Sequence, residues 1–101
     1  MPMTEQLTAE HFRPHVAKIF HVRGGRHALT LTALEAFDLS EAQRQLLPRP
    51  PFTLIFAGPP GDVLPEGEYA FEVEGGPAFE FYVMPIHTAA RDRQDYQAAF
   101  N

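Results

Sequence analysis

Short runs in which apolar and polar residues alternate, separated by glycine and proline, constrain the fold of this chain most. Successive side chains of a β-strand point to opposite faces, so this alternation predicts strands that bury one face. Six such runs predict an all-β domain with minor α content: a small six-stranded antiparallel barrel or sandwich over residues 1–101. The inward residues are Phe20 and Val22, Leu29 and Leu31, alternate positions of 52–57, 68–74 and 78–86, and Tyr96, Ala98 and Phe100.

The first hairpin has Gly24–Gly25 as its turn. With these two residues in the turn, Phe20 faces Leu29, and the apolar residues of both strands share one face. A Gly-Gly pair favours a type I′ turn, in which both central residues have positive φ. Farther along the second strand the apolar phase changes from odd to even numbers, which predicts a β-bulge at Thr32–Ala33.

A later hairpin is predicted from the same parity argument. The apolar residues on both of its strands have odd numbers, so its turn contains an odd number of residues. A three-residue turn at 75–77 pairs Phe71 with Phe81 and Val73 with Phe79.

This register also predicts an acidic cluster on the outer face. Glu72 lies opposite Glu80, with Glu74 beside them. Close carboxylates bind a cation or share a proton, so the three are a candidate cation or acidic site. The alternative is that an arginine, Arg91 or Arg93, folds over them, or that water screens their charges.

Two short helical segments are expected outside the strands. Residues 4–15 predict an N-terminal helix with Thr8 as its N-cap. Residues 38–51 form the longest irregular connection, in which Ser40 and Gln43 fit a capping box for a brief helical turn.

Charge and composition exclude several classes of partner. The net charge is −5 and the chain has a single lysine, whereas phosphate backbones are bound chiefly through Lys and Arg. We therefore expect neither nucleic acid nor membrane as a partner. The chain contains no cysteine, and it has no basic region followed by an apolar run of the signal-peptide kind. These features predict a cytoplasmic protein.

Motifs that carry chemistry are lacking. Ser40 is the only serine and has no Gly-x-Ser-x-Gly context. His11 and His15 have the spacing that places two imidazoles on one helical face, but no third metal ligand accompanies them. We expect no catalytic residue, no metal and no cofactor.

Four large apolar residues fall on the outer face of the predicted sheet: Ile55, Tyr82, Met84 and Ile86. Burying one such side chain contributes about 1.5–3 kcal/mol, so four exposed together favour a cover. The cover is either the chain's own helical segments or another protein molecule, a partner or a second copy. The internal candidates are Leu7 and Phe12, or Leu39, Leu46 and Leu47.

Several stretches are shared with a known family: LTAEHFRPHV, RPPFTLIFAGPP, LPEGEY, YVMPI and YQAAFN. Together they make the chain similar to a family of small uncharacterised bacterial proteins described only as a domain of unknown function. The most specific parts are Arg-x-Pro-Phe at Arg49–Phe52 and Tyr-x-Ala-x-Phe-Asn at Tyr96–Asn101. Ala17 departs from the resemblance, because the family favours glycine there. The resemblance implies genes near phage tail-collar-like proteins, hence a role in a tail-like or fibrous assembly, and it supplies no catalytic residues.

These features predict a non-enzymatic protein-interaction module, a subunit or accessory factor of a larger bacterial assembly. Its expected interface is Ile55, Tyr82, Met84 and Ile86. The alternative is a small-ligand-binding or catalytic β-barrel whose pocket holds glutamates and histidines. A pocket with convergent polar groups favours this alternative, whereas a flat apolar patch favours assembly.

Overall fold

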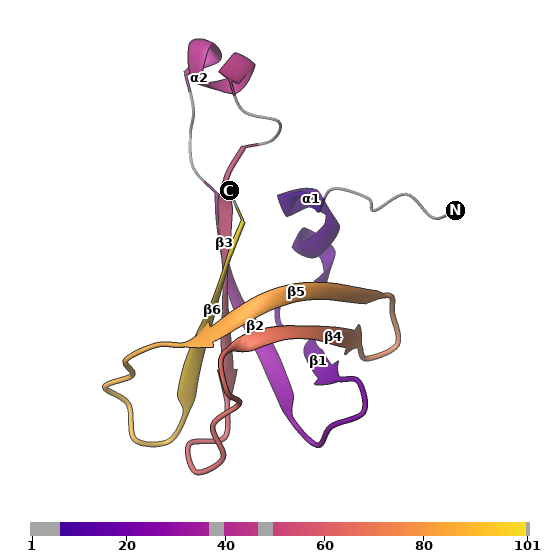
Figure 1. Cartoon of the computed structure of the whole chain (residues 1–101), viewed down its shortest axis with the longest axis vertical. Helices are drawn as coiled ribbons and strands as arrows, with labels where there is room; N and C mark the ends of the chain where they lie inside the picture. The colour runs from indigo at the N-terminus through magenta and orange to yellow at the C-terminus, as the bar shows by residue number, and fades with distance from the viewer. Residues whose placement is uncertain (1–6, 37–39, 47–49, 101) are drawn as a thin grey trace.

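A computed structural model describes residues 7–36, 40–46 and 50–100 of the chain. It contains a closed barrel of six antiparallel strands in the order β1-β2-β3-β6-β5-β4, which confirms the predicted fold class and selects the barrel over the sandwich. Figure 1 shows β4 and β5 running across β2, β3 and β6. The strands are β1 (Ile19–Val22), β2 (Ala28–Ala36), β3 (Phe52–Gly58), β4 (Gly67–Val73), β5 (Ala78–Pro85) and β6 (Gln94–Phe100).

The N-terminal helix is shorter than the sequence predicts. It consists of α1 (Ala9–Phe12) and a 3-10 turn, η1 (Arg13–His15). Thr8 is the N-cap, but the reciprocal partner in the first turn is His11, whose Nδ1 accepts a hydrogen bond from the Thr8 backbone N–H at 2.9 Å. Residues 4–6 of the predicted helix lie outside the described residues.

The second helix, α2 (Glu41–Leu46), begins with the predicted capping box. The Ser40 N–H donates to Gln43 Oε1 at 2.9 Å, and the Gln43 N–H donates to Ser40 Oγ at 3.3 Å. Figure 1 shows α2 standing apart from the barrel, beyond the end where α1 lies.

The first hairpin has the predicted register but a different turn. Phe20 pairs with Leu29, and the Gly25 N–H donates to the Val22 carbonyl at 3.2 Å. Gly24 has φ of 77°, and Gly25 has no positive φ. The predicted type I′ turn is therefore wrong, because that turn needs positive φ at both glycines, whereas a type II turn needs it only at its third residue.

The predicted bulge on β2 is confirmed. The register of β2 against β3 shifts between Leu31 and Ala33, and the Thr32 hydroxyl donates to the Ile55 carbonyl at 3.1 Å. A bulge bends a strand and increases its twist, which helps a small sheet to close.

The β4–β5 hairpin has a three-residue turn, but at 74–76 and not at 75–77. Phe71 pairs with Phe79, and Tyr69 pairs with Phe81. The predicted register is thus wrong by two residues. The physical reason is Gly75, which has φ of 72° and stands at the centre of the turn. The Val73 N–H closes the turn by donating to the Pro77 carbonyl at 2.9 Å.

The barrel interior is filled by apolar side chains, many of them aromatic. Phe12 on α1 is fully buried at one end, with ring centroids 4.6 Å from Phe79 and 5.5 Å from Phe100. Leu64, in the loop between β3 and β4, is buried at the opposite end, and its N–H donates to the Tyr96 hydroxyl oxygen at 2.8 Å. Both ends of the barrel are therefore closed by side chains of this chain.

Candidate functional site

β5 is paired along one side and almost unpaired along the other. Its residues 78–83 pair with 67–72 of β4. Toward β6, the register partners among residues 7–36, 40–46 and 50–100 are limited to Gln97 for Met84 and Tyr96 for Pro85. The barrel is therefore split between the first part of β5 and the end of β6, where Figure 1 shows the two strands diverging. We call residues 78–82 of β5 the free edge.

The direction of the backbone groups along the free edge follows from the pairing. In an antiparallel pair, hydrogen-bonded positions alternate with non-bonded ones. The Val73 N–H donates to the Pro77 carbonyl, so the odd-numbered residues of β5 bond to β4. The even-numbered residues face the other way, as the Ile86 N–H shows by donating to Asp95 of β6 at 3.0 Å. The N–H and C=O groups of 78, 80 and 82 accordingly point into the split.

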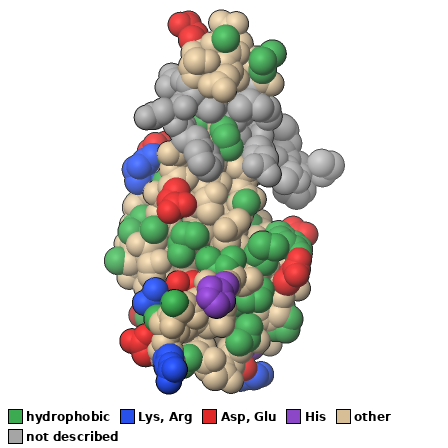
Figure 2. Space-filling view, turned by 90° about the vertical axis from the view of Figure 1, so that its left-hand side faces the viewer, with side chains coloured by type: hydrophobic (Ala, Val, Ile, Leu, Met, Phe, Trp, Pro, Cys, Tyr) green, Lys and Arg blue, Asp and Glu red, His purple; other side chains and the backbone are tan. Residues whose placement is uncertain are grey.

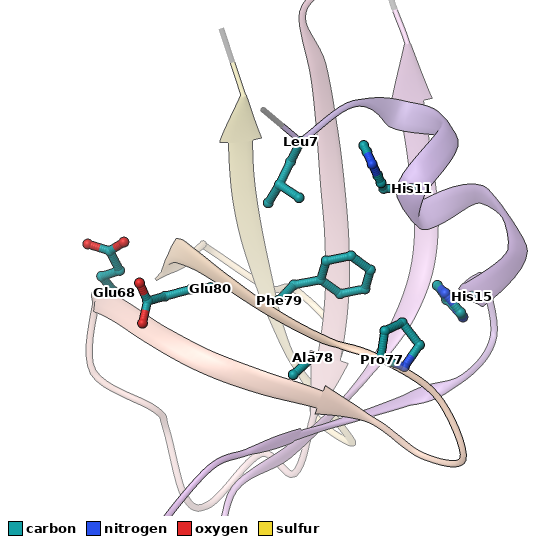
Figure 3. Close-up of a pocket in the computed structure, with 8 residues that line it drawn as sticks. All are labelled: Leu7, His11, His15, Glu68, Pro77, Ala78, Phe79 and Glu80. Carbon is teal, nitrogen blue, oxygen red and sulfur yellow. The ribbon is translucent and has the colours of Figure 1, made fainter. Parts of the chain in front are cut away.

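A cavity of about 540 Å³ lies along the free edge. Figure 3 shows α1 and η1 on one side of it and the β4–β5 hairpin on the other. The N-terminal segment contributes Leu7, His11 and His15. The hairpin contributes Glu68, Pro77, Ala78, Phe79 and Glu80.

The two histidines of the cavity are held by the helical segment. His11 is a capping residue, since its Nδ1 lies 2.9 Å from the Thr8 nitrogen and 3.0 Å from Thr8 Oγ1. The His15 ring packs against Phe20 and Phe79, with centroids 6.5 and 5.9 Å away. Burial, with a smaller contribution from the Lys18 charge, lowers the pKa of His15. His15 is therefore neutral at pH 7, since its pKa is below the ordinary value of about 6.5.

The two glutamates of the cavity lie on the other side of Phe79. In Figure 3 the carboxylates of Glu68 and Glu80 are separated from the imidazoles by the Phe79 side chain. Among the described residues neither carboxylate has an ion-pair partner. Carboxylates and imidazoles therefore do not converge on one point, as a general acid–base pair must.

The predicted acidic cluster is dispersed by the two-residue change of register. Glu72 lies opposite Ala78 and pairs with Arg23 at 3.2 Å. Glu74 pairs with His21 at 3.0 Å. Glu80 lies opposite Ala70 and lines the cavity instead.

A cation site has no support in this arrangement. Within 7–36, 40–46 and 50–100 no group of three or more metal-ligating side chains is assembled. The arginine that neutralises part of the cluster is Arg23 of the first hairpin, whereas Arg93 pairs with Asp95 at 2.8 Å.

The four predicted interface residues do lie on the outer surface of the barrel. Ile55 and Met84 flank Gln97 in one row across β3, β6 and β5. Ile55, Met84 and Ile86 are half-buried, and Tyr82 is 48% exposed. We call these four residues the outer apolar face. Figure 2 shows hydrophobic side chains gathered on the outer surface of the barrel, on the side where the β5–β6 loop lies.

The parts of the helical segments that the structure describes do not cover the outer apolar face. Phe12 points into the barrel, and Leu7 lines the cavity at the free edge. Leu46 is 82% exposed on α2. Leu39 and Leu47 lie outside the described residues.

The sequence gives no direct signal of the free edge; its one hint of an open strand position is Pro85, which lies outside residues 78–82 and faces the β4 side. Pro85 lacks a donor on the side where β4 has already ended, because the pairing of β4 stops at Gly67 with Val83. Proline in a strand indicates such a position. The extent of the split depends on how β5 and β6 diverge, which no local pattern encodes.

The family model described as "Domain of unknown function (DUF6916)" matches residues 7–100. No curated protein and no solved structure matches the chain. Among the described residues, none of the helices is long and apolar enough to cross a membrane.

Proposed function

We propose that this chain, which belongs to the DUF6916 family of unknown function, is a non-enzymatic protein-interaction module. It binds an extended segment of another protein, which adds as a strand to the free edge. The observation that carries the proposal is the one-sided pairing of β5, which leaves the backbone groups of three alternate residues facing the split, two of which, Ala78 and Glu80, line the cavity.

Strand addition suits this geometry because an unpaired strand edge is a template for another chain. Main-chain hydrogen bonds supply affinity, and pockets for alternate side chains supply specificity. In an added strand, every second side chain points to the same side as Phe79 and enters the cavity. The remaining side chains lie on the outer surface beside Glu80 and Tyr82.

The outer apolar face extends the proposed interface. Tyr82 and Met84 alternate along β5, Ile86 follows directly after the strand, and Tyr82 lies within the free edge. The Tyr82 hydroxyl donates to a Glu66 carboxylate oxygen. An added strand lies next to this face. The rest of the partner protein, beyond the added strand, then covers Ile55, Tyr82, Met84 and Ile86. Substituting Met84→Lys is expected to weaken such a partner without unfolding the barrel.

The setting we propose is a larger bacterial assembly of phage-tail-like or fibre type, in which this chain is a subunit or accessory factor. The support for this setting is the resemblance in sequence, with its implied genes near phage tail-collar-like proteins. Co-purification of such a protein with the wild-type chain, and its loss with a variant blocked at the free edge, is the expected result.

The test uses proline to block the free edge. Linear peptides are selected from a random displayed library on the wild-type protein, and their affinities are compared between Glu80→Pro and Glu80→Gln. Proline removes the N–H that faces the split, and a strand edge tolerates it. Glutamine removes only the charge. We expect binding to fall at least about tenfold, or 1.4 kcal/mol, with Glu80→Pro relative to Glu80→Gln.

Two further observations complete this test. The amide spectrum of Glu80→Pro is compared with the wild type to show that the barrel is retained, and peptide-induced shifts in the wild type are mapped onto residues 78–82. Selected peptides that bind Glu80→Pro as well as Glu80→Gln, or a library that yields no binder, would overturn the proposal.

A small ligand in the same cavity is the second candidate function. The observation that favours it is the apolar floor of Leu7 and Phe79 with polar side chains on both sides. A screen of small molecules by protein NMR separates the two. Shifts confined to α1 and to the side chains of His15 and Phe79, with no change in the backbone amides of 78–82, are expected for this candidate only.

A further inference from the structure

We infer that the added strand comes from a different protein and that apolar residues alternate in it with Lys or Arg. This inference rests on the proposed strand addition and names the chemistry of the partner. Three features carry it: two exposed carboxylates beside the free edge without ion-pair partners among the described residues, apolar side chains at the centre of the cavity, and the like charges that a second copy would bring together.

The outer side of the free edge is acidic. Glu80 is exposed at its centre, and Glu68 lies diagonally beside it on β4, because Glu80 pairs with Ala70 and Glu68 pairs with Tyr82. Several other carboxylates of the surface are paired, namely Glu72 with Arg23, Glu74 with His21 and Asp62 with Arg26, whereas Glu35, Glu41, Glu66 and Asp92 form no ion pair with a described residue. In the part of the chain that the structure describes, Glu68 and Glu80 have no such partner.

A basic side chain on the added strand provides an ion-pair partner for these carboxylates. Opposite charges on neighbouring strands stabilise a sheet, and like charges directly opposite destabilise it. The side chain opposite Glu80 on the outer surface is therefore Lys or Arg. The net charge of −5 also increases the rate at which a basic segment is captured.

The cavity side of the free edge selects apolar residues. Phe79 and Leu7 form its floor, and the His15 ring packs against Phe79. A side chain that enters here meets rings and methyl groups, since the carboxylates lie on the other side of Phe79 in Figure 3. Valine, isoleucine or leucine fits this environment, and a charged side chain would lose its hydration.

A second copy of the chain is a poor occupant of the free edge. Two copies that pair antiparallel over all of residues 78–82 place Glu80 opposite Glu80. Each copy also carries the same net charge of −5. The like charges disfavour the self-paired edge that an isologous dimer requires.

The experiment compares two synthetic peptides, acetyl-Val-Lys-Val-Lys-Val-amide and acetyl-Val-Glu-Val-Glu-Val-amide, carrying the same fluorophore. Binding is followed by fluorescence anisotropy at low and at high salt. We expect the lysine peptide to bind the wild type about tenfold more tightly than the glutamate peptide. Added salt should reduce this ratio.

A charge-reversed protein is the matched control. In the double variant Glu68→Lys and Glu80→Lys the preference should change sign, while Glu80→Pro should abolish binding of both peptides. The wild type should sediment as a monomer. A dimer that Glu80→Pro dissociates would overturn the choice of a different protein as partner.

The failures of the inference and of the proposed function are distinguishable. If both peptides bind equally and both are lost with Glu80→Pro, or if neither binds while library-selected peptides still require the free edge, the inference on charge is wrong and strand addition stands. If no peptide of either origin is sensitive to Glu80→Pro, the proposed function itself is wrong, and the inference falls with it.

Discussion

Ala17 is the residue at which the backbone is most clearly strained. Its φ is 76°, a conformation that costs an L-residue with a side chain roughly 1–2 kcal/mol and costs glycine little. The conformation is held because the Ala17 N–H donates to the Leu31 carbonyl at 2.7 Å. The glycine that the sequence resemblance favours here would relieve it.

We therefore expect Ala17→Gly to raise the free energy of unfolding by about 0.5–1 kcal/mol, after the larger chain entropy of glycine is subtracted. Chemical denaturation measures the change. The control is Ala99→Gly, at an exposed position of β6, where the same substitution should lower stability by about 0.5–1 kcal/mol. Equal losses in the two variants would contradict the account of Ala17.

Tyr96 is a buried phenol with a structural hydrogen bond. Its oxygen accepts the Leu64 N–H, which closes the loop over one end of the barrel. Burial raises the pKa of Tyr96, and the hydrogen bond from Leu64 lowers it by less. The protonated phenol therefore contributes stability below pH about 10, its ordinary pKa, and this is lost as pH rises through the higher folded-state pKa.

We expect Tyr96→Phe to lower the free energy of unfolding by about 1–3 kcal/mol at pH 7, because a buried N–H is left without its acceptor. Above pH about 10 the gap to the wild type should narrow, since only the wild type has this phenol to ionise. Urea denaturation at several pH values checks both points. A variant as stable as the wild type at pH 7, with an unchanged alkaline profile, would count against this role.

At the scale of elements, α1 closes one end of the barrel with a single buried side chain, Phe12. The Phe12 ring contacts Phe52, Phe79, Phe81 and Phe100, with centroids 4.6–5.9 Å away. Phe12 lies at the end of the barrel where β5 and β6 diverge. Its packing therefore holds α1, which forms one wall of the cavity, in place.

Phe12→Ala should lower the free energy of unfolding by about 3–5 kcal/mol, because it leaves a cavity among four rings. Phe12→Leu should cost clearly less, since most of the volume is kept. Thermal and urea unfolding give both values. If the alanine variant were no less stable than the leucine variant, α1 would not be packed as described.

The two hairpins show what local sequence determines and what it leaves open. Centring the first hairpin on Gly24–Gly25 predicted its register, Phe20 with Leu29, although the turn itself differs from the predicted type I′ turn. In the second, the turns 74–76 and 75–77 both contain three residues and both place Phe71 and its partner inward. The odd-numbered apolar pattern predicted which side chains are buried but not which residues of the two strands face each other. The predicted cluster of Glu72, Glu74 and Glu80 depended on that pairing.

The candidate site depends on longer-range geometry. The capping role of His11 and the half-buried position of the His15 ring arise because the helix ends after one turn and folds over the end of the barrel. The predicted outer apolar face needed only strand periodicity, and its residues lie where expected. The free edge needed the crossing of β5 over β6, which is set by the packing of the whole core.

At the scale of the whole molecule, the six strands close into a barrel, but β5 and β6 are paired over only part of their length among the described residues. Its interior is occupied by aromatic and aliphatic side chains from every strand, with Phe12 at one end and Leu64 at the other. Because the interior is filled, we expect a partner to bind at the surface. The split between β5 and β6 is the place where the sheet can accept another strand. The outer apolar face and the carboxylates of Glu68 and Glu80 border that same place.

The central claim is that β5 has one bonded side and one open side over residues 78–82, and amide hydrogen exchange measured by NMR tests it directly. In the protein alone, the amides of Phe79 and Phe81 should exchange slowly because they bond to β4, while those of Glu80 and Tyr82 exchange fast. Equal protection of all four amides would show that the edge is already paired and would contradict the account.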